Sequence, residues 1–226
     1  GGITGTVTDT TASAGLTTQT AGGTSLEVSY AAADGAAAPT SVALNAQSAS
    51  TLILSGTADN GALVTLKSDA QDAQPAAAAA VTVGENVTLQ LRNNANPEQT
   101  SGTIGDVTVS GGSMIVTNIA VDAPSLAVEN GTVNIGTNEK RGALSLETLD
   151  IASGSTVFLD PAWSGNAELD TVANASHLSV SALGDIAGNL VVGQNSLAAV
   201  GATADEAVAA FEKLSSVNAG LSWGEN

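Results

Sequence analysis

Cysteine is absent from this chain of 226 residues, and aromatic residues make up only 2% of it. The absence of cysteine excludes a disulfide-stabilised scaffold, a thiolate metal site and a cysteine nucleophile. Because aromatic side chains are so scarce, Ala, Val, Leu and Ile must pack the core. This composition suits thin, regularly repeated layers better than a compact globule built around large side chains.

Basic residues are also scarce, with five against 22 acidic residues, and the formal net charge is −17. Nucleic acid is therefore an unfavourable partner, because its phosphate backbone is bound through Lys and Arg. Anionic lipid surfaces are disfavoured for the same reason. The negative charge is typical of a soluble, extended surface. The five basic residues are Lys67, Arg92, Lys140, Arg141 and Lys213.

The sequence contains neither an apolar run long enough to span a bilayer nor the apolar region of a signal peptide. We therefore expect that the chain does not insert into a membrane and does not carry its own export signal. It opens on Gly1-Gly2 and passes directly into strand-like sequence, as a mature or engineered fragment of a longer protein would.

A short unit recurs along the chain, and residues 125–136, SLAVENGTVNIG, show it clearly. Two apolar-x-apolar pairs flank a polar elbow rich in Gly, Asn and Ser. Alternation with period two predicts strands with one buried face, and the elbow residues tolerate positive φ. Four other units have the same form, with one apolar pair before the elbow and apolar residues after it. The residues before and after the elbow are Val81/Val83 and Val87/Leu89, Val107/Val109 and Met114/Val116, Leu149/Ile151 and Val157/Leu159, and Leu190/Val192 and Leu197.

The spacing of these units predicts a solenoid. Four of them start at residues 81, 107, 126 and 149, which are 26, 19 and 23 residues apart. Such a period, with several short strands in each repeat, predicts a right-handed parallel β-helix of about ten coils, with the apolar residues stacked inside. The alternative is an antiparallel β-sandwich, which also has short strands and frequent turns.

The predicted β-helix occupies residues 1–202. Residues 68–80 (SDAQDAQPAAAAA) and 92–103 (RNNANPEQTSGT) interrupt the repeat and are predicted loop excursions. Residues 203–226 are predicted to form a capping helix and a C-terminal tail. Thr203 and Glu206 have the spacing of a capping box, and such a helix would cover exposed strand edges.

The segments SLAVENGTVNIG, TLDIASGSTVFLDP and NLVVGQNSLAAVG resemble coils in the passenger regions of bacterial autotransporters. The resemblance covers residues 80–226 and extends to the acidic, cysteine-free composition. It implies a β-helical rod that is displayed at the outer membrane by a C-terminal β-barrel. The family includes adhesins, proteases and esterases, so the resemblance does not assign an activity.

Reactive constellations are lacking. The single histidine, His177, has no GDSG or G-x-S-x-G segment to accompany it. One histidine and no cysteine leave only oxygen ligands for a metal, and the Asp59-Asn60-Gly61 segment is better explained as a turn. We therefore predict no catalytic residue, no metal site, no cofactor and no enzymatic activity. Glycosidase chemistry would need two carboxyl groups at a defined separation; the candidate acids are Asp106, Asp122, Asp150, Asp160 and Asp170.

The remaining hypothesis concerns binding. Trp163 follows the turn Asp160-Pro161-Ala162. Two interpretations are open: an exposed Trp at this position would anchor a ligand, and a Trp that packs over the edge of a coil would only stabilise the fold. The sequence therefore predicts Trp163 and Asp160 as binding residues. The predicted role is adhesion, self-association or display by a secreted cell-surface protein, with host or bacterial glycans, proteins or a second copy as partners. The alternatives are a carbohydrate-binding or carbohydrate-active β-helix and a structural surface-layer spacer.

Overall fold

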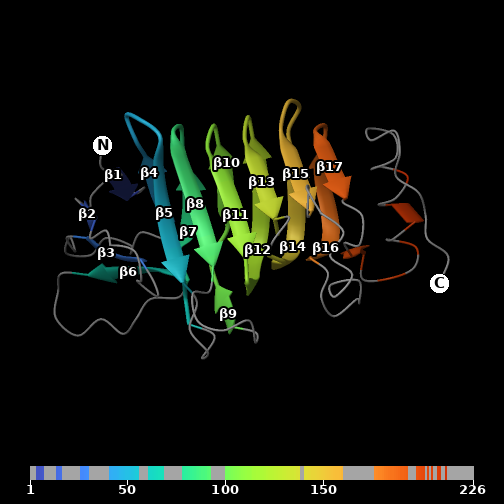
Figure 1. Cartoon of the computed structure of the whole chain (residues 1–226), viewed down its shortest axis with the longest axis horizontal. Helices are drawn as coiled ribbons and strands as arrows, with labels where there is room; N and C mark the ends of the chain where they lie inside the picture. The colour runs from blue at the N-terminus through green and yellow to red at the C-terminus, as the bar shows by residue number, and fades with distance from the viewer. Residues whose placement is uncertain are drawn as a thin grey trace, which may run out of the picture.

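The computed structural model describes residues 4–7, 14–16, 26–30, 41–55, 61–68, 78–92, 100–137, 140–159, 176–192 and 197–201, together with Thr203, Asp205, Val208, Ala209 and Glu212. Over these ranges the protein is all-β, and most strand pairs are parallel. The strands form an elongated stack, with β1 toward one end and β17 toward the other (Figure 1).

The largest sheet of the described residues has nine strands, in the order β1-β4-β7-β10-β12-β14-β16-β18, with β9 paired to β12. Neighbouring strands are parallel except β1 and β4, which are antiparallel. The strands are β1 (Thr4–Val7), β4 (Ser41–Asn45), β7 (Ala80–Val83), β9 (Thr100–Thr103), β10 (Val107–Ser110), β12 (Ile119–Glu129), β14 (Ala143–Ile151), β16 (His177–Ile186) and β18 (Leu197–Val200).

A second sheet of the described part has six strands, all parallel, in the order β17-β15-β13-β11-β8-β5. They are β5 (Ser50–Ser55), β8 (Val87–Arg92), β11 (Ser113–Thr117), β13 (Thr132–Ile135), β15 (Thr156–Leu159) and β17 (Asn189–Val192). A three-stranded sheet joins β2 (Ala14–Leu16), β3 (Leu26–Tyr30) and β6 (Val64–Ser68).

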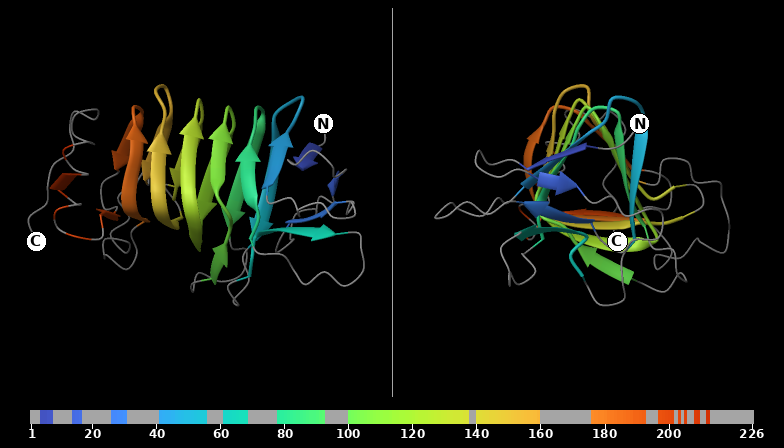
Figure 2. Two further views of the ribbon diagram at one scale, coloured as in Figure 1. Left: turned by 180° about the vertical axis from the view of Figure 1, so that it is seen from behind. Right: turned by 90° about the vertical axis from the view of Figure 1, so that its left-hand side faces the viewer.

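The chain alternates between the two large sheets. From β10 to β17, each strand of the nine-stranded sheet is followed in sequence by one of the six-stranded sheet, and strands of the same sheet pair from one layer to the next. The two sheets face each other across the stack (Figure 2). Because side chains alternate along a strand, each strand directs every second residue toward the opposite sheet.

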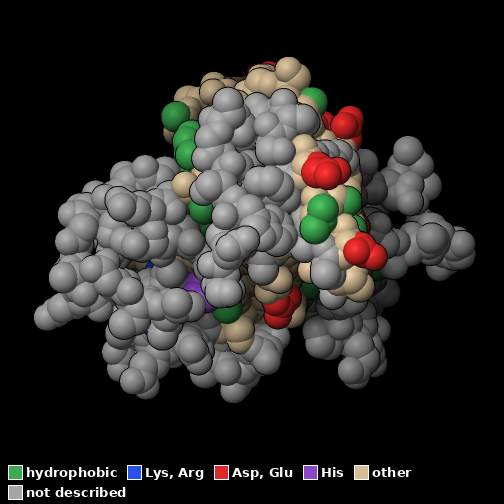
Figure 3. All heavy atoms as spheres, turned by 90° about the vertical axis from the view of Figure 1, so that its right-hand side faces the viewer, with side chains coloured by type: hydrophobic (Ala, Val, Ile, Leu, Met, Phe, Trp, Pro, Cys, Tyr) green, Lys and Arg blue, Asp and Glu red, His purple; other side chains and the backbone are tan. Residues whose placement is uncertain are grey.

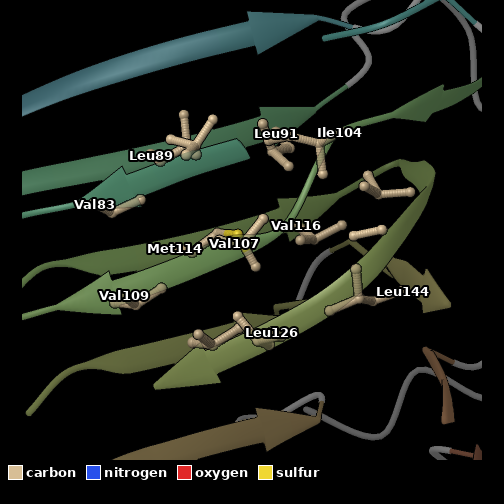
Figure 4. Packing of buried hydrophobic residues seen from close by; sticks show 14 of the residues in the cluster. Val83, Leu89, Leu91, Ile104, Val107, Val109, Met114, Val116, Leu126 and Leu144 are labelled. Carbon is tan, nitrogen blue, oxygen red and sulfur yellow. The ribbon is translucent and has the colours of Figure 1, made fainter. Parts of the chain in front are cut away.

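The predicted inward residues form continuous ladders. Leu126 pairs with Val107 of the preceding layer and with Leu149 of the next. In the other sheet, Val133 lies between Met114 and Val157. All six are at most 2% exposed. Figure 4 shows Val107, Met114 and Leu126 among the buried side chains packed between the sheets. Burying each Leu, Val or Met contributes about 1.5–3 kcal/mol, so these ladders are the main source of stability.

The elbows between the sheets share one backbone feature. Four consecutive elbows that lead from the nine-stranded to the six-stranded sheet each contain a residue with positive φ: Asn86 (63°), Gly111 (81°), Asn130 (54°) and Gly154 (84°). Gly and Asn are the residues that adopt this conformation at least cost. The Gly- and Asn-rich elbows of the sequence are therefore explained by the tight reversal between sheets.

The register corrects three predictions. The antiparallel sandwich is wrong for the repeated part, because successive units pair in parallel. Leu190 and Val192 do not begin a new unit: they pair with Val157 and Leu159 in the six-stranded sheet. The first pair of that layer lies in β16 instead. It was missed because a register shift in β16, where Ile151 pairs with Ile186, breaks the apolar-x-apolar spacing.

The third correction concerns a predicted loop, residues 92–103. Thr100–Thr103 of this segment form β9.

Some predictions fall mostly outside the described residues. Residues 69–77 of the first predicted loop and 93–99 of the second are not described. Of the predicted capping helix, Asp205, Val208, Ala209 and Glu212 have helical backbone and are exposed, and the bounds of the helix lie outside the described residues. In the described part of the chain, no helix has the length and apolar character needed to cross a membrane.

Candidate functional site

An open groove of about 460 Å³ runs across the outer side of the nine-stranded sheet. It crosses β12, β14 and β16 and reaches the segment that follows β9. Its lining residues are Thr103, Ile104, Asp122, Ala123, Pro124, Ser145, Leu146, Glu147, Ser179 and Ser181. Ile104, Ala123 and Leu146 in this set are buried, and its exposed members are polar except Pro124.

One column of polar side chains in the groove follows from strand register. Asp122 pairs with Thr103 on one side and with Ser145 on the other, and Ser145 pairs with Ser179. Their sequence neighbours Val121, Leu144 and Leu178 are buried in the core. Because side chains alternate across a strand, the four polar residues must point outward in one column, with adjacent strands about 4.8 Å apart.

A bend in the strands shapes the groove. In β12 the alternation breaks at Pro124, where neither Pro124 nor Ser125 is buried. Pro cannot donate a ladder hydrogen bond, and such positions accompany bends in a sheet. The same break occurs at Glu147 and Thr148 of β14. Pro124 and Glu147 therefore occupy a corner, where they line the groove beside the column that begins at Thr103.

The groove is chemically suited to a ligand without negative charge. Asp122 and Glu147 supply acceptor oxygens, and the hydroxyls of the lining Ser and Thr residues both donate and accept. Among the lining residues that the structure describes there is no Lys or Arg, so an anionic ligand would meet only like charge from these residues. A neutral, hydroxyl-rich ligand or a cationic one would be complementary.

The other candidate acids that are described have local hydrogen bonds. The Ser125 hydroxyl donates to Asp106 Oδ1 at 2.7 Å. The backbone amide of Asp185 donates to Asp150 Oδ1 at 2.6 Å. Both bonds join neighbouring layers at the surface. In the described ranges, no group of three or more His, Asp or Glu side chains is placed to hold a metal ion.

The predicted binding residues Trp163 and Asp160 lie outside the described residues, as does the candidate acid Asp170. His177 lies at the start of β16, partly exposed, where it pairs with Ala143 and Leu197. Of the predicted acids that the structure describes, Asp122 is the one that lines the groove. Glu147, Ser145 and Ser179 were not predicted as site residues. Their only signal in the sequence is that they alternate with buried residues, and many other outward residues share that signal.

No family model, no curated protein and no solved structure matches the chain.

Proposed function

We propose that the chain forms a right-handed parallel β-helix, the rod of a secreted bacterial surface protein that acts by binding rather than by catalysis. The alternation of strands between two parallel sheets supports the β-helix, since each strand must return to its own sheet one layer further on. Crossovers between parallel strands are right-handed in nearly all proteins. The inward ladders through Leu126 and Val133 supply the continuous core that such a rod needs.

The observation that carries the proposed function is the continuous parallel pairing of strands from β4 to β18. It produces long, regular outer faces, which are what adhesion, self-association and display require. The resemblance of residues 125–136 to coils of autotransporter passengers supports the same role and implies display at the outer membrane.

A bead assay tests this function. Fluorescent beads coated with the purified chain are counted on epithelial cells, on bacterial cells and on bare plastic, with albumin-coated beads as the control. Adhesion predicts retention on at least one cell type above the albumin control. Retention no greater than the control on every cell type would contradict adhesion and leave the structural spacer as the better description. Turnover of glycoside, ester or peptide substrates by the purified chain would contradict a binding role.

The groove favours carbohydrate binding as a second candidate function. Its hydroxyl groups and the carboxylates of Asp122 and Glu147 match the hydrogen bonding of neutral sugar hydroxyls, and none of its described lining residues is a cation that would recruit an acidic sugar. A glycan array probed with the fluorescent chain tests this. The variant Asp122→Asn/Glu147→Gln is expected to lose the signal, and Glu85→Gln, at an exposed elbow outside the groove, is expected to keep it. Binding confined to sulfated or sialylated glycans would contradict the assignment.

A further inference from the structure

The outer face of the six-stranded sheet carries no acidic residue among its described positions. Twelve outward residues of β5, β8, β11, β13, β15 and β17 make up this neutral face. They are Thr51, Ile53, Thr88, Gln90, Ser113, Ile115, Thr132, Asn134, Thr156, Phe158, Asn189 and Val191. In Figure 1 these strands lie toward the viewer. For a chain with 22 acidic residues and a net charge of −17, a whole sheet face free of carboxylates is unexpected.

The neutral face is ordered in two columns. The first consists of Thr and Ser hydroxyls in register from Thr51 to Thr156 and ends at Asn189. Thr88 and Ser113 hydrogen-bond to each other at 3.0 Å within it. The second column mixes Ile, Phe and Val with two amides, and Val191 is 41% exposed. Such a surface offers both apolar contact and hydroxyl groups that donate and accept.

The opposite side of the stack is acidic. The outer side of the nine-stranded sheet carries six acidic residues at described positions, and one of them, Glu129, ends β12 at the elbow that leads to β13. They are Asp106, Asp122, Glu129, Glu147, Asp150 and Asp185. In Figure 3, which views the stack from the end near β17, the visible acidic side chains gather on the right, the side of the nine-stranded sheet. Two copies that approach through this side repel each other, whereas two neutral faces do not.

Opposite charges border the neutral face along its two edges. All strands of a parallel sheet start at one edge and end at the other. At the starting edge, the exposed residues Glu85 and Glu129 precede β8 and β13. At the opposite edge, Arg92 ends β8, and Lys140 and Arg141 follow β13. Each of these two layers therefore has an acid at its start and a base at its end.

We propose that a second copy of this chain docks on the neutral face, with a two-fold axis that runs parallel to the stack. This axis keeps the two stacks pointing in the same direction and reverses the strands across the interface. The starting edge of one copy then meets the ending edge of the other. Within a layer, Arg92 comes to the edge that carries Glu85 of the second copy, and Lys140 comes to the edge that carries Glu129.

The alternative two-fold axis, parallel to the strands, is disfavoured. It would bring the edge with Glu85 and Glu129 against the same edge of the second copy, so that like charges would meet on both sides. Charge complementarity thus selects side-by-side stacks of the same polarity. This is the arrangement of neighbouring molecules displayed from one surface, and in this respect the inference rests on the proposed function.

The size of the neutral face indicates weak, reversible docking. Six strands about 4.8 Å apart and about four residues deep cover roughly 25 Å by 13 Å. The area per copy is well below the roughly 800 Å² of a standard stable interface, so association belongs to the weak class. It would become significant at the high local concentration of a displayed protein.

Sedimentation velocity from micromolar to millimolar concentration tests the docking. We expect the wild-type chain to associate, more strongly at moderate than at very low salt, because salt screens the acidic remainder of the surface. Asn134→Glu and Val191→Glu each place a charge on the neutral face, and a two-fold interface contains each change twice. Each is expected to weaken association at least about tenfold. The matched control Thr108→Glu, outward on β10 of the nine-stranded sheet, is expected to change it less than about twofold.

A charge swap tests the orientation. Lys140→Glu and Glu129→Lys are each expected to weaken association, and the double variant is expected to restore it. No restoration would overturn the parallel arrangement. A wild-type chain that stays monomeric at millimolar concentration, or a control that loses as much as Asn134→Glu, would overturn the docking itself. Circular dichroism on every sample separates these outcomes from failure of the proposed β-helix, which a strongly helical or unfolded spectrum would indicate.

Discussion

Gly136 lies directly against the hydroxyl of Ser176, in the neighbouring layer of the stack. A Cβ at Gly136 would overlap Ser176 Oγ. Gly136 follows β13 with a φ of 85°, and Ser176, which is fully buried, precedes β16. Ser176 Oγ also accepts a hydrogen bond of 3.2 Å from the amide of Gly142. The two elbows therefore fit together only because position 136 has no side chain.

Replacing Gly136 by Ala is expected to destabilise the protein more than replacing Gly154 by Ala. Both residues have positive φ, which costs an Ala about 1–2 kcal/mol. A Cβ at Gly154 meets nothing within 4 Å, whereas at Gly136 the overlap with Ser176 adds about 1–3 kcal/mol. Urea unfolding of both variants measures the difference. Equal losses would show that the elbow relaxes freely.

Removing the Ser176 hydroxyl is expected to cost about 1–3 kcal/mol, because Ser176→Ala leaves the buried amide of Gly142 without its acceptor. Ser179→Ala, three residues later at an exposed outward position of β16, is the matched control and is expected to stay within about 0.5 kcal/mol of wild type. Thermal and urea unfolding report both. A Ser176→Ala variant as stable as the control would mean that water replaces the hydroxyl.

Truncation of an inward residue is expected to be far more costly than truncation of its outward neighbour. Leu149 is fully buried between Leu126 and Leu183, so Leu149→Ala should lose about 2–5 kcal/mol through lost burial and the cavity left behind. Thr148→Ala, next to it on the outer side, should lose less than about 1 kcal/mol. Comparable losses at the two positions would contradict the inward assignment of Leu149.

Salt is expected to stabilise the folded chain against urea. The net charge of the chain is −17, and folding brings carboxylates such as those of Asp122 and Glu147 onto adjacent strands, where they repel each other. Salt screens this repulsion, because the Debye length is about 8 Å at physiological ionic strength. The unfolding free energy should rise between very low and physiological salt. The rise should be smaller in Asp122→Asn/Glu147→Gln, which removes two of these charges. A fall in stability with added salt would contradict this account.

The repeated units show where sequence reasoning succeeds. Leu126 and Val128 were predicted to stack on Val107 and Val109, and the strand register confirms this. The prediction succeeds because alternation with period two leaves only one phase that buries the apolar residues. It fails at Leu190, where the register shift in β16 displaces the alternation by one position and makes the second pair of a layer look like the first.

The groove was predictable only in part. Asp122 was among the candidate acids, but Glu147, Ser145 and Ser179 come from two further strands. Their alignment with Asp122 depends on the number of residues between neighbouring layers, which the sequence does not reveal. The units start 26, 19 and 23 residues apart, so the layers differ in length. A column of outward side chains appears only when the strands are placed in register.

The sequence alone determines that this chain is built from short strands with aliphatic inner faces and Gly- or Asn-bearing elbows. It does so because side-chain alternation and positive φ are local properties of a few residues. The tertiary structure decides which outward residues become neighbours. It gathers acids on one side of the stack, leaves the face from Thr51 to Val191 free of them, and brings Asp122 beside Ser145, because hydrogen bonding between layers joins residues that the chain itself holds far apart.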